Sequence, residues 1–66
     1  MMYKRLKEEL HDKGEMMIRF TSGEEAELHL HNTEFVEEPF IKVDADDEIH
    51  WFNAEEVERY YIHKEF

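Results

Sequence analysis

The clearest pattern in the chain is the stretch EAELHLH at residues 25–31, in which apolar and polar side chains alternate. A period of two is typical of a strand that has one face in the core and one in solvent. We expect Ala26, Leu28 and Leu30 to face inward, and the glutamates and histidines between them to face outward. The pattern predicts a strand that continues through a bend over residues 25–36.

Segments with the same period lie on both sides of this stretch. They predict strands at about 16–20, 40–43, 48–52 and 59–64. Glycine readily adopts positive φ, so Gly23 is expected in the turn that joins the first of these strands to residues 25–36.

The start of the chain and the segment before the last strand have helical patterns. Met2, Leu6 and Leu10 recur every four residues, which predicts a helix over 2–12 that ends near Gly14. Asn53 resembles a helix N-cap, so one helical turn is expected at 54–58.

The element order predicts a single α+β domain spanning residues 1–66. An N-terminal helix precedes a five-stranded antiparallel, barrel-like sheet, with one helical turn before the last strand. This order resembles the small barrels of the Sm-like and SH3-like kind. Sm-like proteins bind RNA through basic and polar loops, whereas the matching loops here are acidic. The resemblance therefore implies the fold and not the function.

The chain has only 66 residues and no cysteine. A domain of this size buries only about 60% of its unfolded surface, and no disulfide can reinforce it. We therefore expect a homodimer, in which a second copy supplies further burial. The N-terminal residues lack the apolar run of a signal peptide, and no stretch approaches the length of a membrane span. The expected location is cytoplasmic (the host cytoplasm if a phage encodes the chain).

Negative charge dominates the composition and is unevenly placed. Asp and Glu number 18 against 8 Lys and Arg, for a formal net charge of −10. The first thirteen residues hold four basic and three acidic side chains, so the excess of carboxylates belongs to the strands and turns. Such a charge repels DNA, RNA and anionic membranes. The chain also lacks a Ser–His or Cys–His arrangement and a phosphate-binding glycine loop, so neither an enzyme nor a cofactor is predicted.

The carboxylates favour a surface that binds a basic protein, although solubility alone is an alternative explanation. Carboxylates two residues apart on a strand lie about 6.6–6.8 Å apart, close to two phosphate spacings of about 3.4 Å in DNA. In size, acidity and the lack of cysteine and catalytic motifs, the chain resembles the small acidic phage-type DNA-mimic inhibitors, such as the phage inhibitor of the histone-like protein HU.

This resemblance implies a non-catalytic inhibitor that occupies the nucleic-acid-binding surface of a basic, nucleoid-associated type of protein. The candidate partner-binding residues are Glu24, Glu25, Glu27, Asp44, Asp46, Asp47, Glu48, Glu55 and Glu56.

Aromatic residues late in the chain suggest a second interpretation. We expect Ile49 and Trp51 to share the core-facing side of their strand. Phe52 and Tyr61 would then lie on the other side of their strands. Closure of the barrel or cover by the helix would bury them there; alternatively, they form a subunit or partner interface, because interfaces are enriched in aromatic residues. The alternative function is a general protein–protein interaction module.

His29 and His31 share one strand face beside Glu27 and have the spacing of a possible zinc pair. A third ligand would come from His50, His63 or a glutamate across the sheet. Outward polar residues on an alternating strand are more commonly explained by solvation. The predicted function therefore includes no metal, and a metal-responsive protein using His29 and His31 is kept as an alternative.

Overall fold

The computed structural model describes residues 1–64 as one helix and six strands. The elements are α1 (Met2–Lys13), β1 (Glu15–Phe20), β2 (Glu25–His29), β3 (Thr33–Glu37), β4 (Phe40–Ala45), β5 (Glu48–Asn53), the 3₁₀ turn η1 (Ala54–Glu56) and β6 (Val57–Tyr61). Gly14 ends α1 with a φ of 85°, and its N–H donates to the Leu10 carbonyl at 2.8 Å. Gly23 takes the predicted positive φ in the β1–β2 turn.

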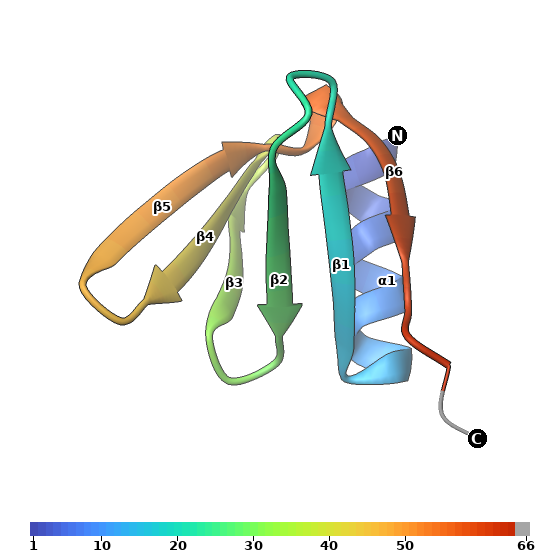
Figure 1. Cartoon of the computed structure of the whole chain (residues 1–66), viewed down its shortest axis with the longest axis horizontal. Coiled ribbons are helices and arrows are strands. Elements are labelled where there is room, and N and C mark those ends of the chain that lie inside the picture. Colours follow the sequence, from blue (N-terminus) through green and yellow to red (C-terminus); the bar gives the residue numbers. More distant parts are fainter. Residues whose placement is uncertain (65–66) are drawn as a thin grey trace.

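The strands form two antiparallel three-stranded sheets (Figure 1). Sheet A has the order β2-β1-β6, and sheet B has the order β3-β4-β5. The helix packs against β1 and η1 and lies behind sheet A in Figure 1. The fully buried side chains come from α1, β1, β2 and β4, so the core lies between the helix and the inner faces of both sheets. They are Leu6, Leu10, Met16, Ile18, Leu28 and Ile41.

The predicted five-stranded, barrel-like sheet is wrong, because the predicted strand 25–36 is divided in two. β2 ends at His29 and β3 begins at Thr33. Between them, the Asn32 side-chain oxygen accepts the His29 N–H at 2.9 Å and the Thr33 hydroxyl at 2.6 Å. The Asn32 N–H in turn donates to the His29 carbonyl at 3.1 Å. These bonds close a tight corner, at which the chain leaves sheet A and begins sheet B.

Leu30 lies in this corner and is 51% exposed, so its predicted inward orientation is also wrong. The corner is fastened to both sheets by backbone hydrogen bonds. The Leu30 N–H donates to the Gly14 carbonyl at 3.3 Å, and the Asp44 N–H donates to the Asn32 carbonyl at 2.8 Å. Within the described residues no ladder joins β2 to β5, so the two sheets do not close into a barrel.

The strand predicted at 48–52 is β5, and the face that it buries is the opposite of the predicted one. Ile49 and Trp51 are 48% and 58% exposed, whereas Phe52 packs against the core. The register explains this, since Phe52 lies opposite the buried Ile41 on β4. Cross-strand partners share a face, so the face that β4 buries decides which face β5 buries.

Tyr3 anchors the start of the helix. Its ring meets Phe35 edge-on, with centroids 5.3 Å apart. Burial raises the pKa of the Tyr3 phenol above its ordinary value of 10.0, and the nearby carboxylates of Glu38 and Glu37 raise it further. The folded protein therefore favours the neutral phenol.

We predict that the Tyr3 phenol loses its proton above its ordinary pKa of 10.0 and weakens the fold as it does so. Because its pKa is higher in the folded state, its contribution to stability is complete below pH 10 and is lost as the pH rises through the folded pKa. Spectrophotometric titration should show a late phenolate phase that Tyr3→Phe removes. Urea unfolding of Tyr3→Phe should show a smaller loss of stability above pH 10, and an unchanged titration curve would contradict the assignment.

Candidate functional site

A cleft of about 450 Å³ lies between the free edges of the two sheets. Figure 1 shows β2 and β5 diverging from the end of the molecule that holds η1. Phe20 of sheet A and Phe52 of sheet B line the cleft, with ring centroids 4.8 Å apart. This aromatic contact forms an apolar floor that joins the sheets where their edges separate.

The β2 side of the cleft is acidic. Glu24, Glu25 and Glu27 line it and are exposed. None of the lining residues found within residues 1–64 is a lysine or arginine. The cleft thus combines an apolar floor with a carboxylate rim.

The β2 edge also offers unpaired backbone groups. The Phe20 N–H donates to the Glu24 carbonyl at 2.8 Å, which makes these two residues a hydrogen-bonded pair at the end of the β1–β2 ladder. Such pairs alternate along an antiparallel ladder, so the N–H and C=O groups of Glu25 and Glu27 point away from β1. They face the cleft, and a further strand could pair with them.

The β5 side of the cleft carries His50. Its ring stacks on Phe52 at 5.5 Å with an interplanar angle of 9°, and its Nε2 lies 3.0 Å from Glu48 Oε1. Val43 and Ala45 of β4 complete this wall. The lining on this side is therefore mainly apolar, and its histidine contacts the Glu48 carboxylate.

The structure places the nine predicted acidic residues in three groups, and all nine are exposed. Three lie on or beside β2, four lie in or beside the β4–β5 turn, and two lie in η1 (Figure 1). Only the β2 group lines the cleft. The carboxylates therefore do not form one continuous flat surface. They belong to β2, to the β4–β5 turn and to η1, which follows β5.

Basic residues lie mainly outside this opening. The helix carries four of them, on the far side of sheet A in Figure 1. On the outer face of sheet A, Arg19 lies opposite both Glu25 and Arg59, and Arg59 also sits 5.2 Å over the Tyr61 ring. Positive and negative groups are therefore mixed around Arg19 and Arg59, whereas the lining of the cleft found within residues 1–64 includes no lysine or arginine.

A second depression, of about 510 Å³, lies beside the helix. Lys4, Arg5 and Glu8 line it together with Tyr60, so charges of both signs surround it. Tyr60 of β6 is the one strand residue in its lining within residues 1–64, and two of the lining residues are cations. We therefore regard the cleft between β2 and β5 as the candidate functional site.

The two predicted interface aromatics are not brought together. Phe52 lies in the cleft, whereas Tyr61 lies on the outer face of sheet A, where its hydroxyl contacts Glu25 Oε1 at 3.4 Å. Their role as an interface stays a prediction.

Alanine substitutions in β5 should separate the two faces of that strand. We predict that Phe52→Ala costs about 2 kcal/mol or more of unfolding free energy, because it removes the contact with Phe20. Trp51→Ala should cost less than about 1 kcal/mol, because Trp51 is exposed and its nearest cation, Lys42 Nζ, lies 6.0 Å from the ring. Urea unfolding at low protein concentration measures both. A larger loss for Trp51→Ala would contradict the observed face assignment.

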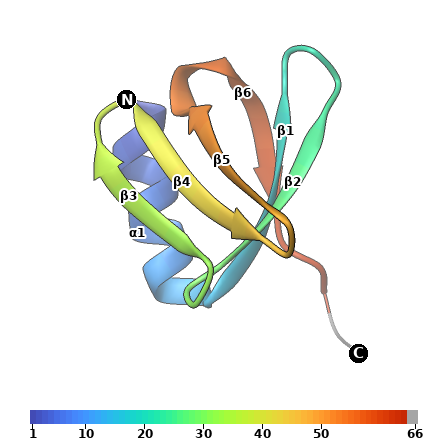
Figure 2. The ribbon, with the colours of Figure 1, turned by 90° about the vertical axis from the view of Figure 1, so that its left-hand side faces the viewer.

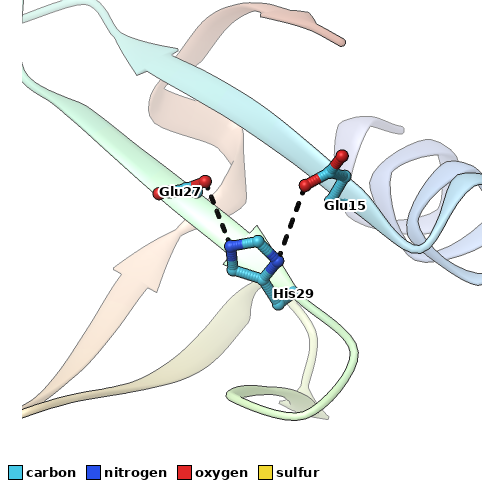
Figure 3. Close-up of side chains that lie close together, drawn as sticks. All are labelled: Glu15, Glu27 and His29. Atoms are coloured by element: carbon cyan, nitrogen blue, oxygen red, sulfur yellow. Dashed lines mark ion pairs between the residues drawn. The ribbon is translucent and has the colours of Figure 1, made fainter. Parts of the chain in front are cut away.

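The predicted histidine pair lies on the outer face of sheet A, away from the cleft floor. The rings of His29 and His31 stack with centroids 5.2 Å apart, and His29 Nε2 lies 3.1 Å from Glu27 Oε2. The structure adds Glu15, whose Oε1 lies 3.8 Å from His29 Nδ1 (Figure 3). Sequence reasoning anticipated a glutamate across the sheet but did not identify Glu15, because the residues meet only through the β1–β2 register.

No protein-family model matches the sequence, and neither a curated protein nor a solved structure matches the chain. Among residues 1–64, no helix has the length and apolar character needed to span a bilayer. The resemblance to DNA-mimic inhibitors therefore stays a prediction, and the functional argument depends on the cleft.

Proposed function

We propose that this protein is a non-catalytic acidic binding protein that occupies the nucleic-acid-binding surface of a basic partner protein. It does so by accepting an extended basic segment of that partner along the edge of β2. One observation carries the proposal: the free edge at Glu25 and Glu27 combines unpaired backbone groups with carboxylates, beside an apolar floor and without a lining cation among residues 1–64.

Strand addition explains how such an edge selects its partner. An added strand gains affinity from main-chain hydrogen bonds, while its side chains alternate between two faces. Those on the outer face lie beside the carboxylates of Glu25 and Glu27, which favours lysine or arginine. Those on the inner face lie over Phe20 and Phe52, which favours apolar side chains. The expected ligand is therefore an extended segment with alternating basic and apolar residues.

The remaining carboxylates act over a longer range. The remaining acidic residues belong to η1 and to the β4–β5 turn, which lie at the two ends of β5 (Figure 1). The chain has a net charge of −10, and these residues contribute to a negative potential that speeds its encounter with a basic protein. The same potential repels anions from this chain. A partner held here cannot use the same basic segment to bind phosphates, which supports inhibition by mimicry.

A displacement experiment tests this function with HU as the probe protein. We predict that the chain releases HU from a fluorescently labelled DNA duplex, measured as a fall in anisotropy. Direct binding of the chain to HU, measured by calorimetry, should weaken on the order of tenfold between 50 and 300 mM salt because exposed charges are screened. The double variant Glu25→Gln/Glu27→Gln should weaken it by a similar factor.

The double variant Glu37→Gln/Glu38→Gln is the matched control. It makes the same change in net charge, but at the β3–β4 turn, which Figure 2 shows beside the start of the helix and across the molecule from β2. A much smaller loss is expected for this control. Equal losses in both variants would show that net charge alone acts, and no binding of HU at low salt would contradict the proposal for this class of partner.

A second candidate function, self-association, is favoured by the outer face of sheet B. Phe40, Ile49 and Trp51 lie on this face and are 43% to 58% exposed. Ile49 and Trp51 belong to β5, which is an edge strand with no partner on its outer side among the described residues. An unpaired apolar edge readily joins a second copy of itself. We infer that two copies pair their β5 edges antiparallel, around a twofold axis.

Salt should act on self-association in the opposite direction from its effect on a basic partner. Two copies that each carry a charge of −10 repel one another, so salt should strengthen the dimer by screening. Sedimentation equilibrium should show more dimer at 500 mM than at 50 mM salt, and Ile49→Ser/Trp51→Ser should abolish it. A chain that stays monomeric at high concentration and high salt would contradict this candidate.

A further inference from the structure

The outer face of sheet A holds a cluster of metal-ligating side chains, of which Glu27 also lines the cleft whereas Glu15 and His29 do not. Glu15 and His29 lie directly opposite each other in the β1–β2 register, and Glu27 lies two residues before His29 on β2. Figure 3 shows both carboxylates directed toward the imidazole. One ligand atom from each of the three residues lies within 4.8 Å of the other two.

The chemistry of this donor set suits a first-row divalent ion. Zinc takes imidazole nitrogen at about 2.0–2.1 Å and carboxylate oxygen at about 2.0–2.2 Å, so its ligand atoms stand roughly 3–4 Å apart. The His29–Glu27 and His29–Glu15 contacts, at 3.1 and 3.8 Å, are already in this range. Glu27 contacts Nε2 of the His29 ring, whereas Glu15 contacts Nδ1. A single ion binds only one of these two nitrogens, so one of the carboxylates is on the wrong side of the ring.

A small rearrangement of one glutamate removes this mismatch. The side chains of Glu15 and Glu27 are 54% and 57% exposed, so either carboxylate can swing around the ring. His29 is only 28% exposed and stacks on His31, which restricts its orientation. A fixed imidazole with two adjustable carboxylates is a favourable start for a metal site.

His63 is the candidate for a fourth donor, although its ring is not part of the group of ligand atoms that lie within 4.8 Å of one another. It lines the same shallow depression as Glu15 and Glu27. Met17 pairs with Tyr61 across β1 and β6, and extending this register by two residues places His63 opposite Glu15. Glu15 on the central strand β1 therefore lies between His29 on β2 and His63, which follows the end of β6.

The surrounding charge favours a cation over an empty cluster. Two carboxylates close together repel each other, and the chain as a whole carries a charge of −10. The mixed nitrogen and oxygen ligands distinguish between ions, because magnesium and calcium prefer oxygen alone, whereas zinc accepts imidazole. We propose that Glu15, Glu27, His29 and His63 bind one zinc-like divalent transition-metal ion on the outer face of sheet A.

His50 provides an internal comparison. Its Nε2 lies 3.0 Å from Glu48 Oε1, much as His29 lies beside Glu27. No third potential ligand accompanies this pair among the described residues. His50 should therefore contribute nothing measurable to metal binding, although its local contact is similar.

Titration of the full chain with Zn²⁺ alone tests the proposal. Calorimetry should show one saturable ion per chain, and Ca²⁺ and Mg²⁺ should give no comparable heat. His29→Gln should weaken Zn²⁺ binding by more than about tenfold, since loss of even an indirect supporting partner costs 10–100-fold in metal sites. Glu15→Gln should weaken it as well, and His50→Gln should leave it unchanged. The NMR signals of the His29 and His63 rings should shift on binding while that of His11 does not.

Three outcomes would overturn the proposal: no saturable Zn²⁺ binding, equal losses for His29→Gln and His50→Gln, or unshifted His29 ring signals. Circular dichroism of each variant separates loss of the fold from loss of the site, and Glu15→Gln gives a second test with minimal change in shape. The measurements use no protein partner, and neither His29 nor Glu15 lines the cleft. The metal site and the proposed binding function can therefore fail separately.

Discussion

The corner at residues 30–32 is the constraint on which the architecture depends. Asn32 accepts the His29 N–H and the Thr33 hydroxyl, and backbone bonds from Leu30 and Asp44 join the corner to both sheets. The chain therefore leaves sheet A after five residues of β2 instead of running on as one long strand. Because of this break, the edges of β2 and β5 stay separate, and the cleft exists between them.

The small core and the large charge act against each other. The aromatic contact between Phe20 and Phe52 joins the sheets beside the cleft, and the buried residues of α1 cover the inner side. Carboxylates stand around the opening, where their mutual repulsion opposes compactness. A basic segment or a bound cation would relieve this repulsion, so binding and stability should be coupled in this protein.

The local elements were largely predictable because their signals lie within a few residues. Helical spacing together with Gly14 predicted the N-terminal helix, and the period of two at residues 16–20 predicted β1. The orientation of β5 was not predictable from its own residues, since both of its faces carry aromatics. Only the pairing of Ile41 with Phe52 decides which face is buried.

The candidate sites show the same division. The acidic run at residues 24–27 and the two histidines that follow were evident, and His63 and an unidentified glutamate were named as possible ligands. The identity of that glutamate as Glu15 and the apolar floor beside Glu25 were not evident. Each depends on residues from different strands, and such contacts follow from register and sheet order rather than from sequence spacing.

The amino-acid sequence by itself determined the charge, the helix and the alternation of individual strands, because these depend on composition and on neighbours within a few positions. The tertiary structure alone decided that the chain divides into two sheets, that Phe52 rather than Trp51 turns inward, and that one edge of β2 remains open. Those outcomes depend on which strands pair and on the hydrogen bonds that the Asn32 side chain accepts at the corner. Neither follows from the pattern of neighbouring residues in the sequence.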